Sequence, residues 1–402
     1  MAPILNPDIL VWARETAGLS LEEAAHSIGL KEAYGESGAE RLAALEAGAE
    51  EPSRPLLLKM AKAYRRSLLV FYLDRRPRTG DRGKDFRTLP GGKEPLYNPV
   101  LDALLRDIRG RQSIIRSLLE DSEVEKLPFI GSATVDVPVS TLAERITAQL
   151  RFDLSSFRKQ AKIEEAFAYL RARTEASRIF VMLLGNLGSH HTNIPVDTFR
   201  GFALADSIAP LVVINDNDAV SAWSFTALHE VAHLWLGATG LSGFVGGLKI
   251  EQYCSDVAAQ ILLPPNELEE FARARTLSFD QLAERISQFA DKRNISRAMV
   301  AFRIFRTGAI AERTYDELRE KFYKDWVAHT EREALKQKGQ EGGPSYYVVR
   351  RHKIGKALLA LANRSLGEGL LTYTKAARLL GVKARNVEPL LSGGPASRGG
   401  ES

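Results

Sequence analysis

The amino-acid sequence predicts a mainly α-helical protein that contains one small sheet. Apolar residues recur at helical spacing along most of the 402 residues, which is the primary signal of amphipathic helices. Three short apolar runs, at 179–184, 199–204 and 211–214, are typical of buried strands. A strongly apolar helical segment follows the third run. The centre of the chain is therefore expected to be an α+β domain with helical segments before and after it.

Residues 1–78 are expected to form a set of short helices. Four helices are predicted, over residues 8–17, 20–29, 38–47 and 55–64, with a short apolar end at 68–72. Ser20 and Glu23 have the spacing of a capping box for the second helix. The order of the helices, with Leu45-Glu46-Ala47-Gly48 and Pro52, resembles a helix-turn-helix of the Xre type. Such a domain places its third helix in the major groove of DNA.

The charge of this N-terminal module leaves two hypotheses about its function open. Residues 1–80 contain eleven Lys/Arg and eleven Asp/Glu, whereas affinity for DNA depends largely on neutralising phosphates. The candidate DNA contacts are Arg41 in the third helix and Arg65 and Arg66 after the fourth. The alternative is a helical module that docks protein.

The C-terminal segment carries more than the whole net charge of the chain. Residues 346–402 contain ten Lys/Arg and three Asp/Glu, a net of 10 − 3 = +7, against +5 for the whole chain. Within it, the run from Leu371 to Val382 resembles a miniature helix-turn-helix. The candidate DNA contacts here are Lys375, Arg378, Lys383 and Arg385. The alternative is a basic cap exposed to solvent.

Five segments are predicted along the chain: a helix-turn-helix domain (1–78), a linker and helical connector (79–135), a central domain (136–330), a basic helical segment (345–391) and a disordered, Gly/Ser/Pro-rich tail (392–402). Beyond the N-terminal domain, helices are predicted over 99–120, 139–150, 155–174, 279–289, 296–307, 347–362 and 372–380. A polar, glycine-rich linker is predicted over 329–344.

His229-Glu230-Val231-Ala232-His233 is the most informative motif. Residues four apart lie on one face of a helix, so both imidazoles can bind one metal ion, and Glu230 can act as the catalytic base. Zinc prefers imidazole and carboxylate ligands, and a catalytic zinc needs three protein ligands and one open position. The alternative is a pair of helix histidines whose hydrogen bonds are satisfied within a core.

Glu251 is the predicted third ligand. It lies near the start of an apolar helical run that ends at Pro264, and a carboxylate on the apolar side of a helix needs a partner. Asp256 is the rival ligand. Because it lies five residues after Glu251, it does not share the same helix face. Cys254 could also face the metal, but a single cysteine in an apolar helix is more often a small core residue.

Four blocks in series carry a family resemblance: Phe199-Arg-Gly-Phe-Ala-Leu204, Ala209-Pro-Leu-Val-Val-Ile-Asn215, the segment from Phe225 to His233, and the segment from Glu251 to Pro264. Together they resemble the ImmA/IrrE family of zinc metallopeptidases, in the long form that begins with an Xre-type helix-turn-helix. The resemblance implies a gluzincin-like fold, with His229, His233 and Glu251 on Zn²⁺ and Glu230 as the catalytic carboxylate. It also implies cleavage of a partner protein, a repressor or an antitoxin.

Two positions depart from the pattern that this family often shows. Ser255 stands in place of Asn and Val257 in place of Phe, and we expect both changes to concern packing rather than chemistry.

Three strands followed by the metal helix is the order found in zincins, which bind substrate by adding its backbone to an exposed sheet edge. Residues 199–204 are the candidate edge. Tyr253, His190 and His191 are candidate donors to the oxyanion of the transition state. Two alternatives to an enzyme remain: a transcription regulator with a non-catalytic zinc site, and an antitoxin-like binding module. Glu230 favours the enzyme, because a structural zinc site has no use for this carboxylate.

The composition is that of a soluble protein of the cytoplasm. Cys254 is the single cysteine of the chain, which excludes an internal disulfide and suits a reducing compartment. No apolar run approaches the roughly 20 residues needed to span a bilayer, and the N-terminus lacks the pattern of a signal peptide. We therefore expect no membrane partner.

Overall fold

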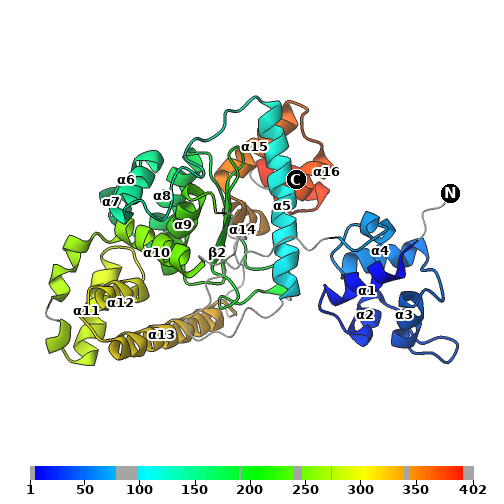
Figure 1. The fold of residues 1–402 in the computed structure, drawn as a ribbon, viewed down its shortest axis with the longest axis horizontal. Helices are drawn as coiled ribbons and strands as arrows, with labels where there is room; N and C mark the ends of the chain where they lie inside the picture. Colours follow the sequence, from blue (N-terminus) through cyan, green and yellow to red (C-terminus); the bar gives the residue numbers. More distant parts are fainter. Residues whose placement is uncertain are drawn as a thin grey trace, which may run out of the picture. The chain divides into compact units, whose positions relative to one another are not determined.

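The computed structural model describes residues 5–77, 98–189, 192–238, 247–272, 274–338 and 345–392, with backbone alone at 247–248, 333–335 and 337–338. The chain divides into two compact units (Figure 1). The smaller unit contains residues 1–82 and 93–107, and the larger one contains 83–92 and 108–402. Residues 78–97, within the stretch predicted as a linker before the helix at 99–120, and the predicted tail from residue 393 onward lie outside the described residues.

The smaller unit is a bundle of short helices: α1 (Pro7–Glu15), α2 (Leu21–Ile28), α3 (Gly38–Glu46), α4 (Arg54–Ala63) and the 3₁₀ turn η1 (Leu68–Tyr72). The capping box of Ser20 and Glu23 is formed as predicted. Gly29 ends α2 in the left-handed conformation, with φ of 69°. Trp12, Leu42, Met60 and other apolar side chains from every helix form one buried core. Helix α5 (Pro99–Asp121) begins in this unit and continues into the larger one.

The sheet of the larger unit has three short strands, β1 (Phe180–Leu183), β2 (Gly201–Leu204) and β3 (Leu211–Ile214). Their order is β1-β3-β2, with β1 parallel and β2 antiparallel to β3. Every strand residue is buried, because helices cover the sheet. The predicted candidate edge, residues 199–204, therefore contains a strand that does lie at an edge of the sheet.

Helices make up most of the rest of the larger unit (Figure 1). They are α6 (Val139–Leu150), α7 (Leu154–Arg158), α8 (Ile163–Ala176), α9 (Val220–Trp235), α10 (Gly247–Leu262), η3 (Pro265–Phe271), η4 (Ala274–Thr276), α11 (Phe279–Asp291), α12 (Arg297–Arg306) and α13 (Glu312–Lys338). Helix α9 packs against α8, α10, β2 and β3, so it lies at the centre of the unit.

One predicted helix is interrupted. The sequence indicates a continuous helix over 155–174, but α7 ends at Arg158 and α8 begins at Ile163. Asn294 explains the break: its Nδ2 donates to the carbonyl of Gln160 at 3.0 Å and lies 3.4 Å from the carbonyls of Phe157 and Arg158. A distant side chain thus satisfies carbonyls that a helix would otherwise bond internally.

The linker predicted over 329–344 is wrong in its first part. Helix α13 continues to Lys338, because residues 331–338 are mostly Glu, Arg, Ala, Leu, Lys and Gln, which are strong helix formers. The glycines begin only at Gly339. Polarity alone therefore misplaced the end of this exposed helix.

The basic C-terminal segment, predicted as separate, belongs to the larger unit. Its helices are α14 (Tyr346–Ile354), α15 (Lys356–Gly367), α16 (Tyr373–Leu380), η5 (Ala384–Asn386) and α17 (Val387–Ser392). The helix predicted over 347–362 is broken at Gly355, which has φ of 95°.

A buried ion pair fixes this segment on the sheet. Arg171 and Glu175 pair at 3.2 Å, and Arg171 also donates to the carbonyls of Val181 in β1 and of His352. Glu175 Oε2 accepts from the N–H groups of Lys356 and Ala357 at 3.1 Å each. A carboxylate from α8 therefore caps α15.

Among the described helices, none is both long and apolar enough to cross a membrane.

Candidate metal centre

Two helices, α9 and α10, supply the three predicted metal ligands. Helix α9 is buried on almost every side from Trp223 to Trp235, as its mostly apolar sequence requires. His229 and His233 are one turn apart, and each side chain is 1% exposed. Glu251, on α10, is 20% exposed at its side chain. Solvent therefore reaches the group on the side of the carboxylate.

The ligand atoms converge closely. His229 Nε2 lies 3.0 Å from His233 Nε2 and 3.1 Å from Glu251 Oε2, and His233 Nε2 lies 3.0 Å from Glu251 Oε1. One ligand atom from each of the three residues lies within 4.8 Å of the others. The three residues predicted from the sequence are therefore brought together as predicted.

The chemistry of this donor set fits a divalent metal. A neutral imidazole carries one N–H and one lone pair. Two Nε2 atoms and a carboxylate that face one another include more acceptors than donors, and burial makes such a mismatch costly. A cation at their common point would satisfy all three groups. Two nitrogens and a carboxylate oxygen are ligands that zinc accepts, with a fourth position left open.

Ser255 corrects one sequence expectation. We expected its departure from the family residue to affect packing, but its Oγ lies 3.1 Å from Nδ1 of His229. A hydrogen bond to the second ring nitrogen orients a metal-binding histidine and selects its tautomer. Ser255 is four residues after Glu251, so it shares the helix face of a ligand, and this spacing is the signal that could have revealed it. Val257 is fully buried, in line with a packing role.

Glu230, the predicted catalytic carboxylate, is 3% exposed and lies against the first residue of β2. A Cβ atom added at Gly201 would lie 3.0 Å from Oε1 of Glu230 and 2.6 Å from Cγ2 of Thr226. The absence of a side chain at residue 201 therefore allows α9 to approach the edge strand with Glu230 between them. Glycine within an apolar strand is a sign of such a close approach, and the sequence prediction overlooked it.

The rival ligands lie elsewhere. Asp256 Oδ2 is 3.3 Å from Nη2 of Arg306, and Asp256 is not part of the metal-ligand group among the described residues. Cys254 is fully buried in the apolar core, as predicted for a small core residue.

The predicted transition-state donors are not brought to the centre. The hydroxyl of Tyr253 donates to the carbonyl of Val137 at 2.7 Å, and two residues after Glu251 its side chain leaves a different face of α10. His190 and His191 lie outside the described residues.

The predicted N-terminal DNA contacts have mainly internal roles. Arg66 Nη2 donates to Thr16 Oγ1 at 2.7 Å, and its guanidinium lies 4.3 Å from the ring centre of Trp12. Arg41 Nη1 donates to the carbonyl of Lys31 at 2.7 Å. Arg65 is exposed, although partial burial lowers its pKa.

The predicted C-terminal contacts Lys375, Arg378, Lys383 and Arg385 are all exposed.

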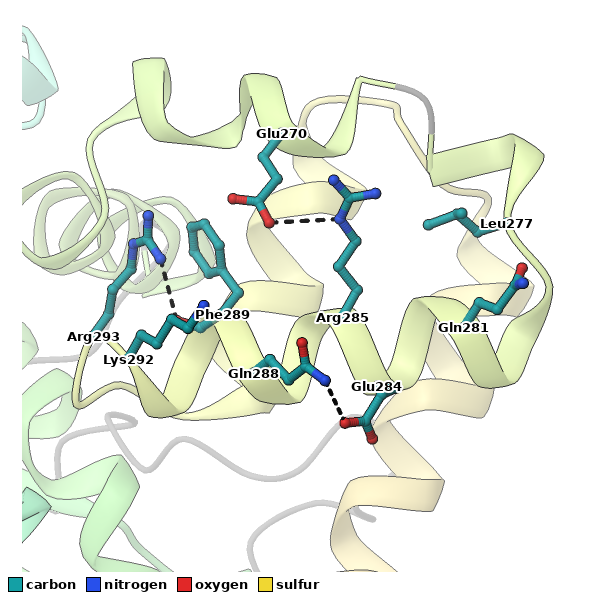
Figure 2. Close-up of a pocket in the computed structure, with 9 residues that line it drawn as sticks. All are labelled: Glu270, Leu277, Gln281, Glu284, Arg285, Gln288, Phe289, Lys292 and Arg293. Carbon is teal, nitrogen blue, oxygen red and sulfur yellow. Dashed lines mark hydrogen bonds and ion pairs between the residues drawn. The ribbon is translucent and has the colours of Figure 1, made fainter.

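A separate pocket of about 620 Å³ lies on α11 and the turns before it (Figure 2). Polar and charged side chains make up most of its lining, and several of them are paired: Arg285 lies 3.5 Å from Glu270, Arg293 lies 2.9 Å from Glu267, and Gln288 donates to Glu284 at 2.8 Å. The pocket contains none of the three metal ligands. It is therefore distinct from the candidate centre.

Comparison with known families gives a match over the segment that contains the candidate centre. Residues 186–305 match the family model described as the IrrE N-terminal-like domain, peptidase family M78. No curated protein and no solved structure matches the chain. The matched segment includes β2, β3, α9 and α10, and thus all three candidate ligands and Glu230. This match supports the ImmA/IrrE resemblance: the segment that forms the candidate centre is similar to the metal-dependent peptidases of family M78.

Proposed function

We propose that this protein is a zinc-dependent endopeptidase that cleaves a partner protein, a transcriptional repressor or an antitoxin. One observation carries the proposal: two imidazoles and a carboxylate converge beside a buried glutamate, and that glutamate lies against an edge strand. His229, His233 and Glu251 would hold the ion. A bound zinc supplies a Lewis acid that polarises a carbonyl and acidifies water.

The residues of the chain would position the substrate and move the proton. Glu230 accepts the proton of the attacking water and then delivers it to the leaving amine. Ser255 keeps His229 oriented, since its Oγ is within hydrogen-bonding distance of Nδ1. The burial of Glu230 keeps its carboxylate directed by protein groups rather than by bulk water.

The two ends of the edge strand β2 differ in how far they are available to a substrate peptide. Gln112 Nε2 donates to the carbonyls of Leu204 and Ala209, at 3.1 and 2.9 Å, and so occupies the far end of β2. The near end, at Gly201, adjoins Glu230. An extended peptide that pairs with the near end would place its backbone next to the proposed base, which is the recognition mode of β-strand addition.

Two other functions predict different behaviour at the same site. A transcription regulator with a non-catalytic zinc site, or an antitoxin-like module that masks a partner, would bind metal or partner without breaking a peptide bond. Glu230 argues for the enzyme, because neither alternative needs a buried carboxylate next to the ligands. Substituting this one residue therefore separates the three functions.

The test uses Glu230→Gln as a trap. The change keeps the size of the side chain and removes the base, so the variant should retain zinc and capture the partner in cells without cleaving it. The captured partner is then mixed with zinc-loaded wild-type protein, and its mass is measured before and after. Glu164→Gln, at an exposed position of α8, is the matched control and should cleave like the wild type. An intact partner after mixing with the wild type, or cleavage by Glu230→Gln at the wild-type rate, would reject this mechanism.

A further inference from the structure

The last helices of the described chain form a compact pair, α16 and α17. They are joined by Gly381 and by the turn η5. Gly381 has φ of 62° and donates its N–H toward the carbonyls of Ala377 and Arg378. Two short helices whose connection, residues 381–386, begins at a left-handed glycine resemble a helix-turn-helix. This pair of helices contains most of the run from Leu371 to Val382 that resembles a miniature helix-turn-helix in the sequence.

Two arginines of α14 brace this helix pair from behind. Arg350 Nη2 donates to the carbonyls of Leu380 and Gly381, at 2.8 and 2.7 Å, and Arg351 Nε donates to the carbonyl of Leu390 at 2.8 Å. Lys353, also on α14, pairs with Asp216 at 2.6 Å. These cations have internal partners. Three of the ten cations of the segment therefore have structural roles and are not available to a ligand.

Four cations of the pair are exposed, although the guanidinium of Arg378 lies beside Gly110 of α5. Lys375, Arg378, Lys383 and Arg385 are exposed, and none of them makes an ion pair with another described residue. Glu388 is the one acidic residue between 373 and 392, so this stretch has a net charge of 4 − 1 = +3. The inner face is apolar, with Ala376, Leu379, Leu380, Val387 and Leu390 buried. The pair thus has an apolar side turned to the protein and a basic side turned to solvent.

We propose that the basic face of α16 and α17 binds double-stranded DNA. In a helix-turn-helix the second helix enters the major groove while the first crosses the phosphate backbone. Lys383, Arg385 and Asn386 lie in the turn directly before the second helix, and arginine and asparagine are the side chains that read guanine and adenine. Lys375 and the 54%-exposed Tyr373 lie at the start of the first helix, where phosphate contacts are made.

The N-terminal domain, the other candidate, lacks such a face on its third helix. The first turn of α3 contains Glu40, whose carboxylate accepts from the N–H of Ser37. Arg41 is bonded to the carbonyl of Lys31, and Arg14 forms a buried pair with Glu46 at 2.8 Å. An acidic start to the helix that would enter the groove opposes binding to phosphate. The structure thus favours the C-terminal pair over α3.

The test measures binding of the full-length, zinc-loaded protein to a labelled duplex of about 30 base pairs, by fluorescence anisotropy at about 50 and about 200 mM salt. The double variant Lys383→Glu/Arg385→Glu should lose at least about tenfold in affinity, with a salt slope lower by about two. The matched control Lys126→Glu/Lys159→Glu changes the net charge equally at two exposed positions of the same unit, and should lose less than about threefold.

A milder variant keeps the test decisive if charge reversal disturbs the fold. Lys383→Gln/Arg385→Gln should still weaken binding severalfold while zinc content and thermal midpoint stay unchanged. The proposal is overturned if the folded variants bind like the wild type, or if the control loses as much affinity. It is equally overturned if no duplex is bound at the lower salt, which would indicate a protein partner, or if single-stranded RNA of equal length binds as tightly. Proteolysis has no part in these readouts, so they are independent of the proposed peptidase activity.

Discussion

Replacing Gly201 with alanine tests the geometry that brings the edge strand to Glu230. The added Cβ would lie 2.6 Å from Cγ2 of Thr226 and 3.0 Å from Oε1 of Glu230. Gly201 lies at the start of β2 and is buried. Its φ is not in the left-handed region, so the steric contact and not backbone strain is the reason for glycine.

Opposing effects set the size of the change. Alanine in place of glycine restricts the unfolded chain and, where the backbone permits it, stabilises by about 0.4–1 kcal/mol. Overpacking a closely packed interior costs about 1–3 kcal/mol. The contact at 2.6 Å is far too close for two carbon atoms, so overpacking dominates. We expect Gly201→Ala to lower the free energy of unfolding by about 1–2 kcal/mol, which is a few degrees in Tm.

Removing the opposing methyl group provides the internal check. Thr226→Ser deletes Cγ2. When Gly201→Ala is made in the Thr226→Ser protein, about half of the stability that Gly201→Ala costs in the wild type should be recovered. The second contact, with Glu230, remains, and cleavage should stay impaired through kcat while zinc content is unchanged. Gly367→Ala is the control, because a Cβ at that helical position meets no atom within 4 Å.

Urea unfolding of the zinc-loaded protein measures these stabilities, followed by the summed fluorescence of its four tryptophans, of which Trp223 and Trp235 are buried on α9. Equal stability of Gly201→Ala and the wild type, or a loss that Thr226→Ser leaves unchanged, would show that the close approach is not what requires glycine at residue 201.

Three further changes test the centre and its surroundings. His229→Ala should lose most of the bound zinc while Asp256→Ala keeps it, as measured by metal analysis of purified protein; the reverse ranking would mean that the ligand set is misassigned. Ser255→Ala should weaken zinc binding by about ten- to hundredfold in a chelator competition, because His229 loses its orienting hydrogen bond; unchanged affinity would make the serine a packing residue after all. Partial burial by itself would raise the pKa of Asp206. Hydrogen bonds from two backbone N–H groups and the charge of a neighbouring arginine outweigh this effect, so the pKa lies below its ordinary value. The stability that this carboxylate contributes is therefore present above its ordinary pKa and is lost as the pH falls below that range, so metal-free Asp206→Asn should lose less stability on acidification than the metal-free wild type; parallel curves would contradict this.

The convergence of His229, His233 and Glu251 could be predicted because the information for it is local. The spacing of His229 and His233 fixes their common face once the segment is helical, and helicity follows from the apolar pattern around them. Glu251 could be found because an acidic residue in an apolar helical run needs a partner. Each inference uses residues that lie within one helix. The structure then adds only the distance between two helices, which the shared metal had already implied.

The features that sequence did not reveal depend on contacts between distant segments. Asn294 breaks a predicted helix more than a hundred residues before it, and a pattern of polar and apolar residues contains no sign of this bond. Glu175 caps α15 from 181 residues away. Gly201 matters because of Thr226 and Glu230, which belong to a different element. In each case the deciding partner is set by the tertiary fold, so periodicity and capping rules cannot supply it.

The largest effect on stability is expected when the chain is shortened to end after residue 344. The sequence predicts residues 345–391 as a basic helical segment separate from the central domain. In the structure, deletion would remove the carbonyl of His352 from Arg171 and two N–H donors from Glu175. Bonds to charged groups contribute about 1.5–3 kcal/mol each, so their loss alone approaches the total stability of a typical domain, about 5–15 kcal/mol.

The shortened chain should therefore unfold or aggregate at room temperature, as circular dichroism and light scattering would detect, and it should bind little zinc. Lys375→Ala, at an exposed position of the same segment, should keep the Tm and zinc content of the full chain. A shortened chain with the wild-type Tm and a full complement of zinc would refute this reasoning, because the buried pair of Arg171 and Glu175 could then lose its C-terminal partners without consequence.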